Sequence, residues 1–247
     1  MLEVARVSRS FAGIQALSEV DFRVEPGSIT ALIGPNGAGK TTLINLITGV
    51  MPPSTGELRF DGMRISGLRP HRVERLGIRR TFQTVHLFPG LTVRENLTVG
   101  AFRPALHTRP WSIFGLPSRD RGPERRRADA LLEMLGLAAF GDEVATDLPY
   151  GTQRRVEIAR AMMGEPRFLL LDEPAAGMNE TETRTLTDDI RLIRSEGITV
   201  FLVEHDMSLV MSVSDKVVVL NFGRMIAQGT PAEVQRDPEV IASYLGG

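Results

Sequence analysis

The sequence predicts an α/β fold with a core of buried parallel strands, a flanking antiparallel β subdomain and an inserted helical subdomain. Short apolar runs, rich in β-branched residues or leucine, recur along the chain, which is typical of parallel strands buried on both faces. Polar and apolar residues alternate near the N-terminus, as in strands with one exposed face. The middle of the chain shows helical periodicity instead.

The antiparallel β subdomain is expected at residues 2–25 and 56–65, where apolar residues occupy alternate positions. Asp61-Gly62 lies within the second segment and favours a tight hairpin turn. The core strands are predicted at residues 29–33, 168–171, 199–203 and 216–220.

Helical patterns fall between residues 91 and 164, with Gly136 and Gly164 as end signals. Near the C-terminus, Thr230 with Glu233 forms a capping box, and Asp237-Pro238 begins a last short helix. We therefore expect a single domain over residues 1–247. Residues 1–84 and 165–247 would form the core with its β subdomain, and residues 85–164 the helical subdomain.

Composition excludes several classes of protein. The 247 residues carry a net charge of −1, which does not favour non-specific nucleic-acid binding. The absence of cysteine excludes disulfides and thiolate metal sites and suits a reducing cytoplasm. The first residues lack the apolar region of a signal peptide, and no apolar stretch approaches the ~18–20 residues that span a bilayer. Any membrane role is expected to pass through a partner.

A phosphate-binding pattern follows the strand predicted at residues 29–33. The segment Gly34-Pro35-Asn36-Gly37-Ala38-Gly39-Lys40-Thr41 matches G-x-x-x-x-G-K-[ST] and precedes a helical run. Its glycines let successive N–H groups converge on phosphate oxygens beside a helix N-terminus. Lys40, one of only two lysines among 29 basic residues, would reach the β- and γ-phosphates. Thr41 would ligate Mg²⁺, and Thr42 would add a polar contact.

Two carboxylates follow the strand predicted at residues 168–171, at an edge where open α/β sheets bind ligands. Asp172 would hold Mg²⁺, and Glu173 would orient and deprotonate the attacking water. His205 follows another strand and would contact the γ-phosphate. Gln83 would touch Mg²⁺ and the water. These groups predict the binding and hydrolysis of ATP. A metal cluster at residues 204–206 is rejected, because adjacent side chains on a strand point apart.

The order of these motifs, with Leu148-Pro149-Tyr150-Gly151-Thr152-Gln153 between them, resembles the nucleotide-binding subunits of ATP-binding-cassette (ABC) transporters over essentially the whole chain. The resemblance implies a phosphate-loop (RecA-like) core and a head-to-tail dimer. Tyr150, Gly151 and Thr152 would open a helix that meets ATP held by a second cassette. Pro149 stands where serine is usual, so one hydroxyl contact is missing. The resemblance also implies that Phe11 stacks on adenine.

Three further segments, at residues 172–179, 204–207 and 244–246, resemble the larger ATPase subunit of branched-chain amino-acid importers. That resemblance implies import powered by ATP through two transmembrane permease subunits, with a second ABC ATPase subunit, identical or paralogous. A substrate-binding protein would take part indirectly. The chain would lie peripherally on the cytoplasmic face of the inner membrane.

Other functions remain open from the sequence. The chain could serve another ABC system, such as a urea or amide importer or a lipid exporter. A soluble mechanochemical ATPase acting on DNA or ribosomes usually carries coiled coils or a tandem cassette, which this chain lacks. A regulatory nucleotide-binding module without turnover is disfavoured by Glu173 and His205.

Three features have two interpretations. Asn179 would cap a helix, with Glu182 completing a capping box, and would also lie along the dimer interface. Trp111, Ile113 and Phe114 would close the helical subdomain or contact a membrane subunit. The third feature is a cluster of five arginines, for which a solvated face is the default and contact with partner acids or lipid headgroups is the alternative. The cluster comprises Arg69, Arg72, Arg75, Arg79 and Arg80.

Overall fold

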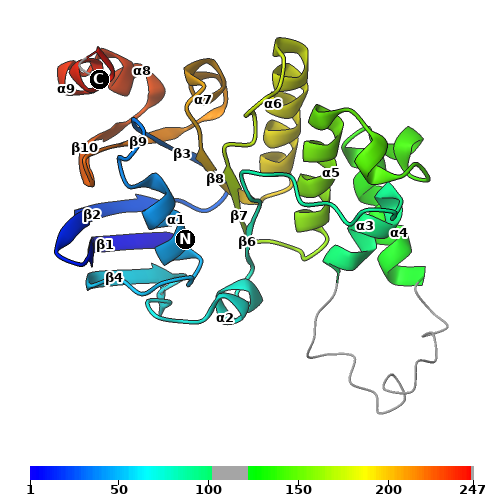
Figure 1. Ribbon diagram of the computed structural model, residues 1–247, viewed down its shortest axis with the longest axis horizontal. Helices are drawn as coiled ribbons and strands as arrows, with labels where there is room; N and C mark the ends of the chain where they lie inside the picture. The colour runs from blue at the N-terminus through cyan, green and yellow to red at the C-terminus, as the bar shows by residue number, and fades with distance from the viewer. Residues whose placement is uncertain (102–121, 246–247) are drawn as a thin grey trace. The chain divides into compact units, whose positions relative to one another are not determined.

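The computed structural model describes residues 1–101 and 122–245, and these divide into two units (Figure 1). The first unit comprises residues 1–80 and 167–247, and the second comprises residues 81–166. Trp111, Ile113 and Phe114 lie outside the described residues. Within the described ranges, no helix combines the length and apolar character needed to cross a bilayer.

A six-stranded sheet forms the centre of the first unit, in the order β10-β9-β3-β8-β7-β6. All neighbours are parallel except β9 and β10, which pair antiparallel. The sequence predicted four of these strands, and it missed β6 and β10, which lie at the two edges. The strands are β3 (Ile29–Ile33), β6 (Ile78–Arg80), β7 (Phe168–Asp172), β8 (Thr199–Val203), β9 (Lys216–Asn221) and β10 (Arg224–Gly229).

The predicted antiparallel subdomain is a second sheet of four strands, in the order β2-β1-β4-β5. At the turn between β4 and β5, Asp61 and Gly62 both have positive φ, 48° and 77°, as a two-residue hairpin loop requires. The strands are β1 (Leu2–Phe11), β2 (Ile14–Val24), β4 (Thr55–Phe60) and β5 (Met63–Arg64).

Three helices of the first unit begin at side-chain caps. Asn179 with Glu182 and Thr230 with Glu233 form complete capping boxes, as predicted. Asp206 also caps a helix by accepting two backbone N–H bonds. The helices are α1 (Lys40–Ile47), α2 (Pro70–Arg75), α6 (Glu180–Ser195), α7 (Met207–Val213), α8 (Pro231–Arg236) and α9 (Pro238–Leu245).

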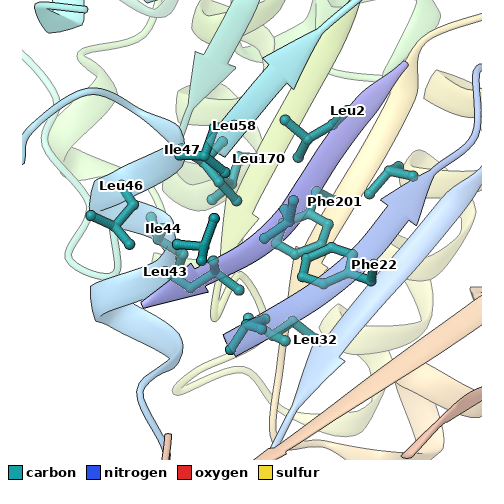
Figure 2. Close-up of a cluster of buried hydrophobic side chains, with 14 of the residues drawn as sticks. Leu2, Phe22, Leu32, Leu43, Ile44, Leu46, Ile47, Leu58, Leu170 and Phe201 are labelled. Carbon is teal, nitrogen blue, oxygen red and sulfur yellow. The ribbon is translucent and has the colours of Figure 1, made fainter. Parts of the chain in front are cut away.

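The apolar core of this unit joins both sheets to α1 (Figure 2). Leu2 and Leu58 come from the antiparallel sheet, and Leu170 comes from the parallel one. Phe22 of β2 stacks on Phe201 of β8 with ring centroids 6.0 Å apart. Burying each such side chain stabilises the fold by about 1.5–3 kcal/mol. This core fixes α1, and hence the loop before it, against the strands.

The second unit is helical. It contains α3 (Val93–Gly100), α4 (Gly122–Met134), α5 (Tyr150–Met162) and two short 3₁₀ turns, Ala138–Phe140 and Ala145–Asp147. α3 packs against both α4 and α5. The approach of α3 to α5 is close, because a Cβ added at Gly100 would lie 2.3 Å from the carbonyl oxygen of Arg160.

Candidate functional site

The order of the strands brings three predicted motifs to one edge of the sheet. β8 lies between β3 and β7, and Val203 is in register with Leu32 on one side and Asp172 on the other. Because the three strands are parallel, the segments that follow them begin side by side. The phosphate-binding loop (residues 34–41), the acidic pair Asp172-Glu173 and the segment that carries His205 are these segments.

Two glycines of the phosphate-binding loop occupy positions that no other residue would fit. Gly34 has φ +152°, and a Cβ there would lie 2.1 Å from the carbonyl oxygen of Leu220. Gly39 has φ +102°, and a Cβ there would lie 2.9 Å from the carbonyl oxygen of Ala16. The loop is therefore held between β9 and the start of β2. Of the other predicted loop residues, Asn36, Gly37 and Thr41 are exposed, Ala38 is buried and Thr42 is half-buried.

The start of α1 is suited to an anion. Gly39 occupies the N-cap position, and no side chain of the described residues caps the first turn. The first turn also carries no acidic residue. Uncapped N–H groups and the positive end of the helix dipole favour a negative ligand at this position. The loop and the helix start therefore fit the phosphates of a nucleotide.

Lys40 is folded back onto the loop. Its Nζ donates to the carbonyl oxygens of Gly34 and Pro35, and the side chain is buried. Burial lowers the pKa of Lys40, and the negative charges of Glu173 and Asp172 raise it in part. The ammonium thus lies within electrostatic range of both acids. The structure thus brings these three side chains to the same edge of the sheet.

Asp172 and Glu173 differ in their surroundings. Asp172 ends β7 and is buried, and its Oδ2 accepts a hydrogen bond from Arg80 Nη2 at 2.9 Å. Glu173 is half-buried and has φ +47°, an unusual conformation for a residue other than glycine, which costs of order 1–3 kcal/mol. Its N–H donates to the carbonyl oxygen of Val203 at 2.8 Å. The neighbouring strand therefore holds Glu173 in this turned conformation.

The arginine cluster is not one solvated face. Arg80 lies in β6, where Nη1 donates to Asn45 Oδ1 at 2.9 Å while Nη2 bonds Asp172. Arg79, in the same strand, forms an ion pair with Glu74. The other three members, Arg69, Arg72 and Arg75, are exposed as expected. Arg79 and Arg80 were expected on a solvated face, and this was wrong. Both lie in the short strand β6, which was not predicted, and both are half-buried.

The residues present fit Mg²⁺ in part. Asp172 and Thr41 supply the carboxylate and hydroxyl oxygens that this ion prefers. Within residues 1–101 and 122–245, no group of three His, Cys, Asp or Glu side chains forms a metal cage. Mg²⁺ usually completes its shell with water and substrate phosphates, so a cage is not required.

The loop after β8 separates two side chains that are adjacent in sequence. The Glu204 side chain is fully buried, whereas the His205 side chain is 62% exposed. The backbone N–H of His205 donates to Glu204 Oε2 at 2.9 Å. The imidazole therefore faces solvent at the edge of the sheet that carries Lys40 and Glu173.

The C-terminal helix α9 reaches the phosphate-binding loop through Tyr244. The backbone N–H of Gly34 donates to the phenolic oxygen. Burial raises the pKa of Tyr244, and this hydrogen bond lowers it in part. Sequence reasoning noted Tyr244 only as part of a resembling tail, since nothing local indicates a contact with residue 34.

Phe11 ends β1 and is 40% exposed. The Arg9 guanidinium lies over its ring, 4.8 Å from the centroid. Stacking on adenine at Phe11 stays a prediction.

The remaining predicted site residues belong to the second unit. Gln83 is exposed in the segment before α3. Tyr150 begins α5 and is 42% exposed, and Thr152 is half-buried. Gly151 is buried. Its contact with ATP held by a second cassette stays a prediction. The surface at the start of α5 consists of Pro149, Tyr150 and Thr152.

Arg154 was missed by sequence reasoning. Its side chain is fully buried in α5, and Nη1 bonds Glu157 Oε2 at 2.9 Å. The guanidinium also donates to the carbonyl oxygens of Phe82 and Gln83 and, at 3.2 Å, to the hydroxyl of Tyr150. It thus joins the segment of Gln83 to the start of α5. The sequence signal that could have indicated this ion pair was the spacing of Arg154 and Glu157, three positions apart on a predicted helix.

Arg154→Met is expected to lower the free energy of unfolding by about 3–5 kcal/mol, because it leaves Glu157 buried without its guanidinium. Burial already raises the pKa of Glu157, and Arg160, 3.8 Å away, is too distant to replace the hydrogen bond. Urea unfolding measures the change. The matched control, Arg154→Met with Glu157→Met, should recover most of the loss, since an apolar pair of similar volume is often neutral. Equal stability of the single variant and the wild type would contradict the prediction.

The chain is similar to known proteins over its whole length. Residues 17–176 match the family model described as ABC transporter, and residues 224–247 match one described as branched-chain amino acid ATP-binding cassette transporter. The chain is 45% identical to the high-affinity branched-chain amino acid transport ATP-binding protein BraF of Pseudomonas aeruginosa, over 100% of this chain and 98% of that protein. It is 42% identical to LivG of Escherichia coli K12, which carries the same description, over 100% and 98%.

A solved structure of a nucleotide-free ATP-binding cassette from an ABC transporter superposes with a TM-score of 0.88 at 32% identity, covering 100% of this chain and 99% of that one. The family match spans more than half of the chain and includes the phosphate-binding loop and both acids. The chain therefore belongs to the ABC transporter family, as one of its ATP-hydrolysing cassettes.

Proposed function

We propose that this chain hydrolyses ATP to power the import of branched-chain amino acids through two separate membrane permease subunits. The observation that carries the ATPase assignment is the meeting of Lys40, Asp172 and Glu173 at one edge of the sheet. The cargo is supported by the names of relatives that match the whole chain and by the match over residues 224–247.

The chain's own residues would divide the chemistry among them. The phosphate-binding loop and Lys40 bind and orient the β- and γ-phosphates. Thr41 and Asp172, with Gln83, would hold Mg²⁺, which when bound neutralises charge that develops on the phosphate oxygens. Arg80 fixes the rotamer of Asp172 through its hydrogen bond to Oδ2. The carboxylate is therefore oriented before nucleotide arrives.

Glu173 would act as the general base. It would take a proton from the water whose oxygen bonds to the γ-phosphorus, while the bond from that phosphorus to the oxygen of ADP breaks. His205, exposed at the same edge, would donate a hydrogen bond to the γ-phosphate as charge moves onto the leaving oxygen. The half-buried position of Glu173 suits a base that must reach water.

A second cassette, identical or paralogous, would complete each site. The start of α5 has no side-chain cap among the described residues, so its N–H groups would favour the triphosphate held by the other subunit. Tyr150, Gly151 and Thr152 would form that contact. The complex would lie on the cytoplasmic face of the inner membrane, with a substrate-binding protein supplying cargo.

Deleting the gene in its native host should abolish most high-affinity uptake of radiolabelled leucine. Expression of the wild-type chain should restore uptake, and expression of Glu173→Gln should not, because transport requires turnover. Uptake of labelled urea, measured in the same cells, is the matched control and should not change. If urea uptake is lost while leucine uptake stays normal, the chain would instead serve a urea or amide importer. If both uptakes stay normal, an import role for these cargoes would be refuted.

A further inference from the structure

Glu204 is a buried acid that the mechanism above does not use. It directly follows β8, and its side chain is fully buried. A carboxylate removed from water is strongly unfavourable unless hydrogen-bond donors replace its hydration. The contacts that satisfy Glu204 therefore indicate what it does.

Those contacts are backbone N–H groups from two different segments. Oε1 accepts from Ala175 at 2.8 Å. Oε2 accepts from His205 at 2.9 Å and from Asp206 at 3.3 Å. The His205 Nδ1 atom lies 3.7 Å from Oε2, beyond hydrogen-bond distance, so the imidazole remains available to a ligand.

The two segments are those that carry the proposed chemistry. Ala175 comes two residues after Glu173, and His205 comes directly after Glu204. The main chain joins the same strand ends once more, because the N–H of Glu173 donates to Val203. The carboxylate of Glu204 thus connects the segment after β7 to the segment after β8 a second time, beyond the ends of the two strands.

We propose that Glu204 is a positioning residue that fixes the segment after Glu173 against the loop of His205, so that base and imidazole keep a constant relative position at the γ-phosphate. This inference rests on the proposed function of Glu173 and His205. It predicts that Glu204 affects the rate of hydrolysis more than the affinity for ATP, because the phosphate-binding loop holds the nucleotide independently.

The chemistry requires a carboxylate at this position. Both oxygens of an ionised carboxylate accept, whereas an amide has one accepting oxygen and one donating NH₂ group. In Glu204→Gln, the NH₂ group must face the N–H of Ala175 or those of His205 and Asp206. One of the two connections is then lost, although the volume and shape of the side chain are almost unchanged.

The test compares the full-length wild type with Glu204→Gln in three measurements. The rate constant for a single turnover of Mg·ATP is expected to fall by about 10- to 100-fold, as small displacements of catalytic groups do. The dissociation constant for ATP should change by less than about threefold, which is within ~0.7 kcal/mol. Amide hydrogen exchange should accelerate at Ala175 or at His205 and Asp206.

The matched control is Glu233→Gln. Glu233 also accepts a backbone N–H, from Thr230 at 2.7 Å, and lies in the same unit. It should keep the wild-type rate and the wild-type exchange at residues 175, 205 and 206. A second variant, Glu204→Gln with His205→Ala, should lose less than the product of the two single losses, because the residues act together.

Several outcomes would overturn the inference. These are an unchanged single-turnover rate in Glu204→Gln, a loss of ATP affinity as large as the loss of rate, and fully multiplicative losses in the double variant. A general loss of stability, with exchange accelerated throughout the unit, would show a merely structural role. Failure of the proposed function is distinguishable, because a wild type without hydrolysis would still show the local exchange change in Glu204→Gln.

Discussion

Glu173→Gln should retain ATP binding and lose turnover by about 10²- to 10⁴-fold, the range typical for removing a general base. The amide keeps the size of the side chain, and the N–H of Glu173 can still donate to the carbonyl oxygen of Val203, so the turn with φ +47° should persist. A neutral amide cannot take the proton of the attacking water. Steady-state ATPase assays give the rate, and titration with a fluorescent ATP analogue gives the affinity.

In this variant, bound ATP should remain unhydrolysed, so the protein is expected to accumulate as a nucleotide-bound dimer. Size-exclusion chromatography with and without Mg·ATP measures the shift in oligomeric state. The matched control is Glu196→Gln, which makes the same chemical change at an exposed position after α6 and should leave turnover unaltered. Hydrolysis at the wild-type rate in Glu173→Gln would remove Glu173 from the role of base.

Lys40→Ala should weaken nucleotide binding itself, by roughly 100-fold in the dissociation constant. Charge-assisted hydrogen bonds contribute about 1.5–3 kcal/mol each, and the ammonium would reach two phosphates. The change also removes the bonds from Nζ to the carbonyl oxygens of Gly34 and Pro35, so the loop loses an internal brace. Isothermal titration calorimetry with ATP measures the affinity.

The other lysine of the chain provides the control for this change. Lys216 Nζ donates to the carbonyl oxygen of Arg23 at 3.3 Å, at the start of β9. Lys216→Ala should bind ATP as the wild type does. Thermal unfolding of both variants separates lost affinity from lost fold. If Lys40→Ala is folded and binds ATP normally, the phosphate-binding role of Lys40 is wrong.

The sequence located the groups of the site because each depends on local chemistry. The phosphate-binding pattern specifies its own loop, since Gly34 and Gly39 need angles and space that only glycine allows. The capping boxes at Asn179 and Thr230 likewise involve residues only three positions apart. Patterns of this range are visible without a structure, because the interacting groups are fixed relative to one another by the chain itself.

The residues that were missed or misjudged all act over long separations. Arg80 bonds Asp172 across 92 positions, Arg154 bonds Phe82 across 72, and Glu204 bonds Ala175 across 29. The residue type does not reveal that a charged side chain is buried, because arginine and glutamate side chains are usually exposed.

The sequence by itself determined the fold class, the phosphate-binding loop, and the acids and histidine that follow the core strands, because local spacing and periodicity specify these features. Only the tertiary structure decided the order β3-β8-β7, which places those segments side by side. It also decided which charges are buried against distant backbone. The physical reason is that such partners are selected by packing of the whole core, whose contacts join residues far apart in the chain.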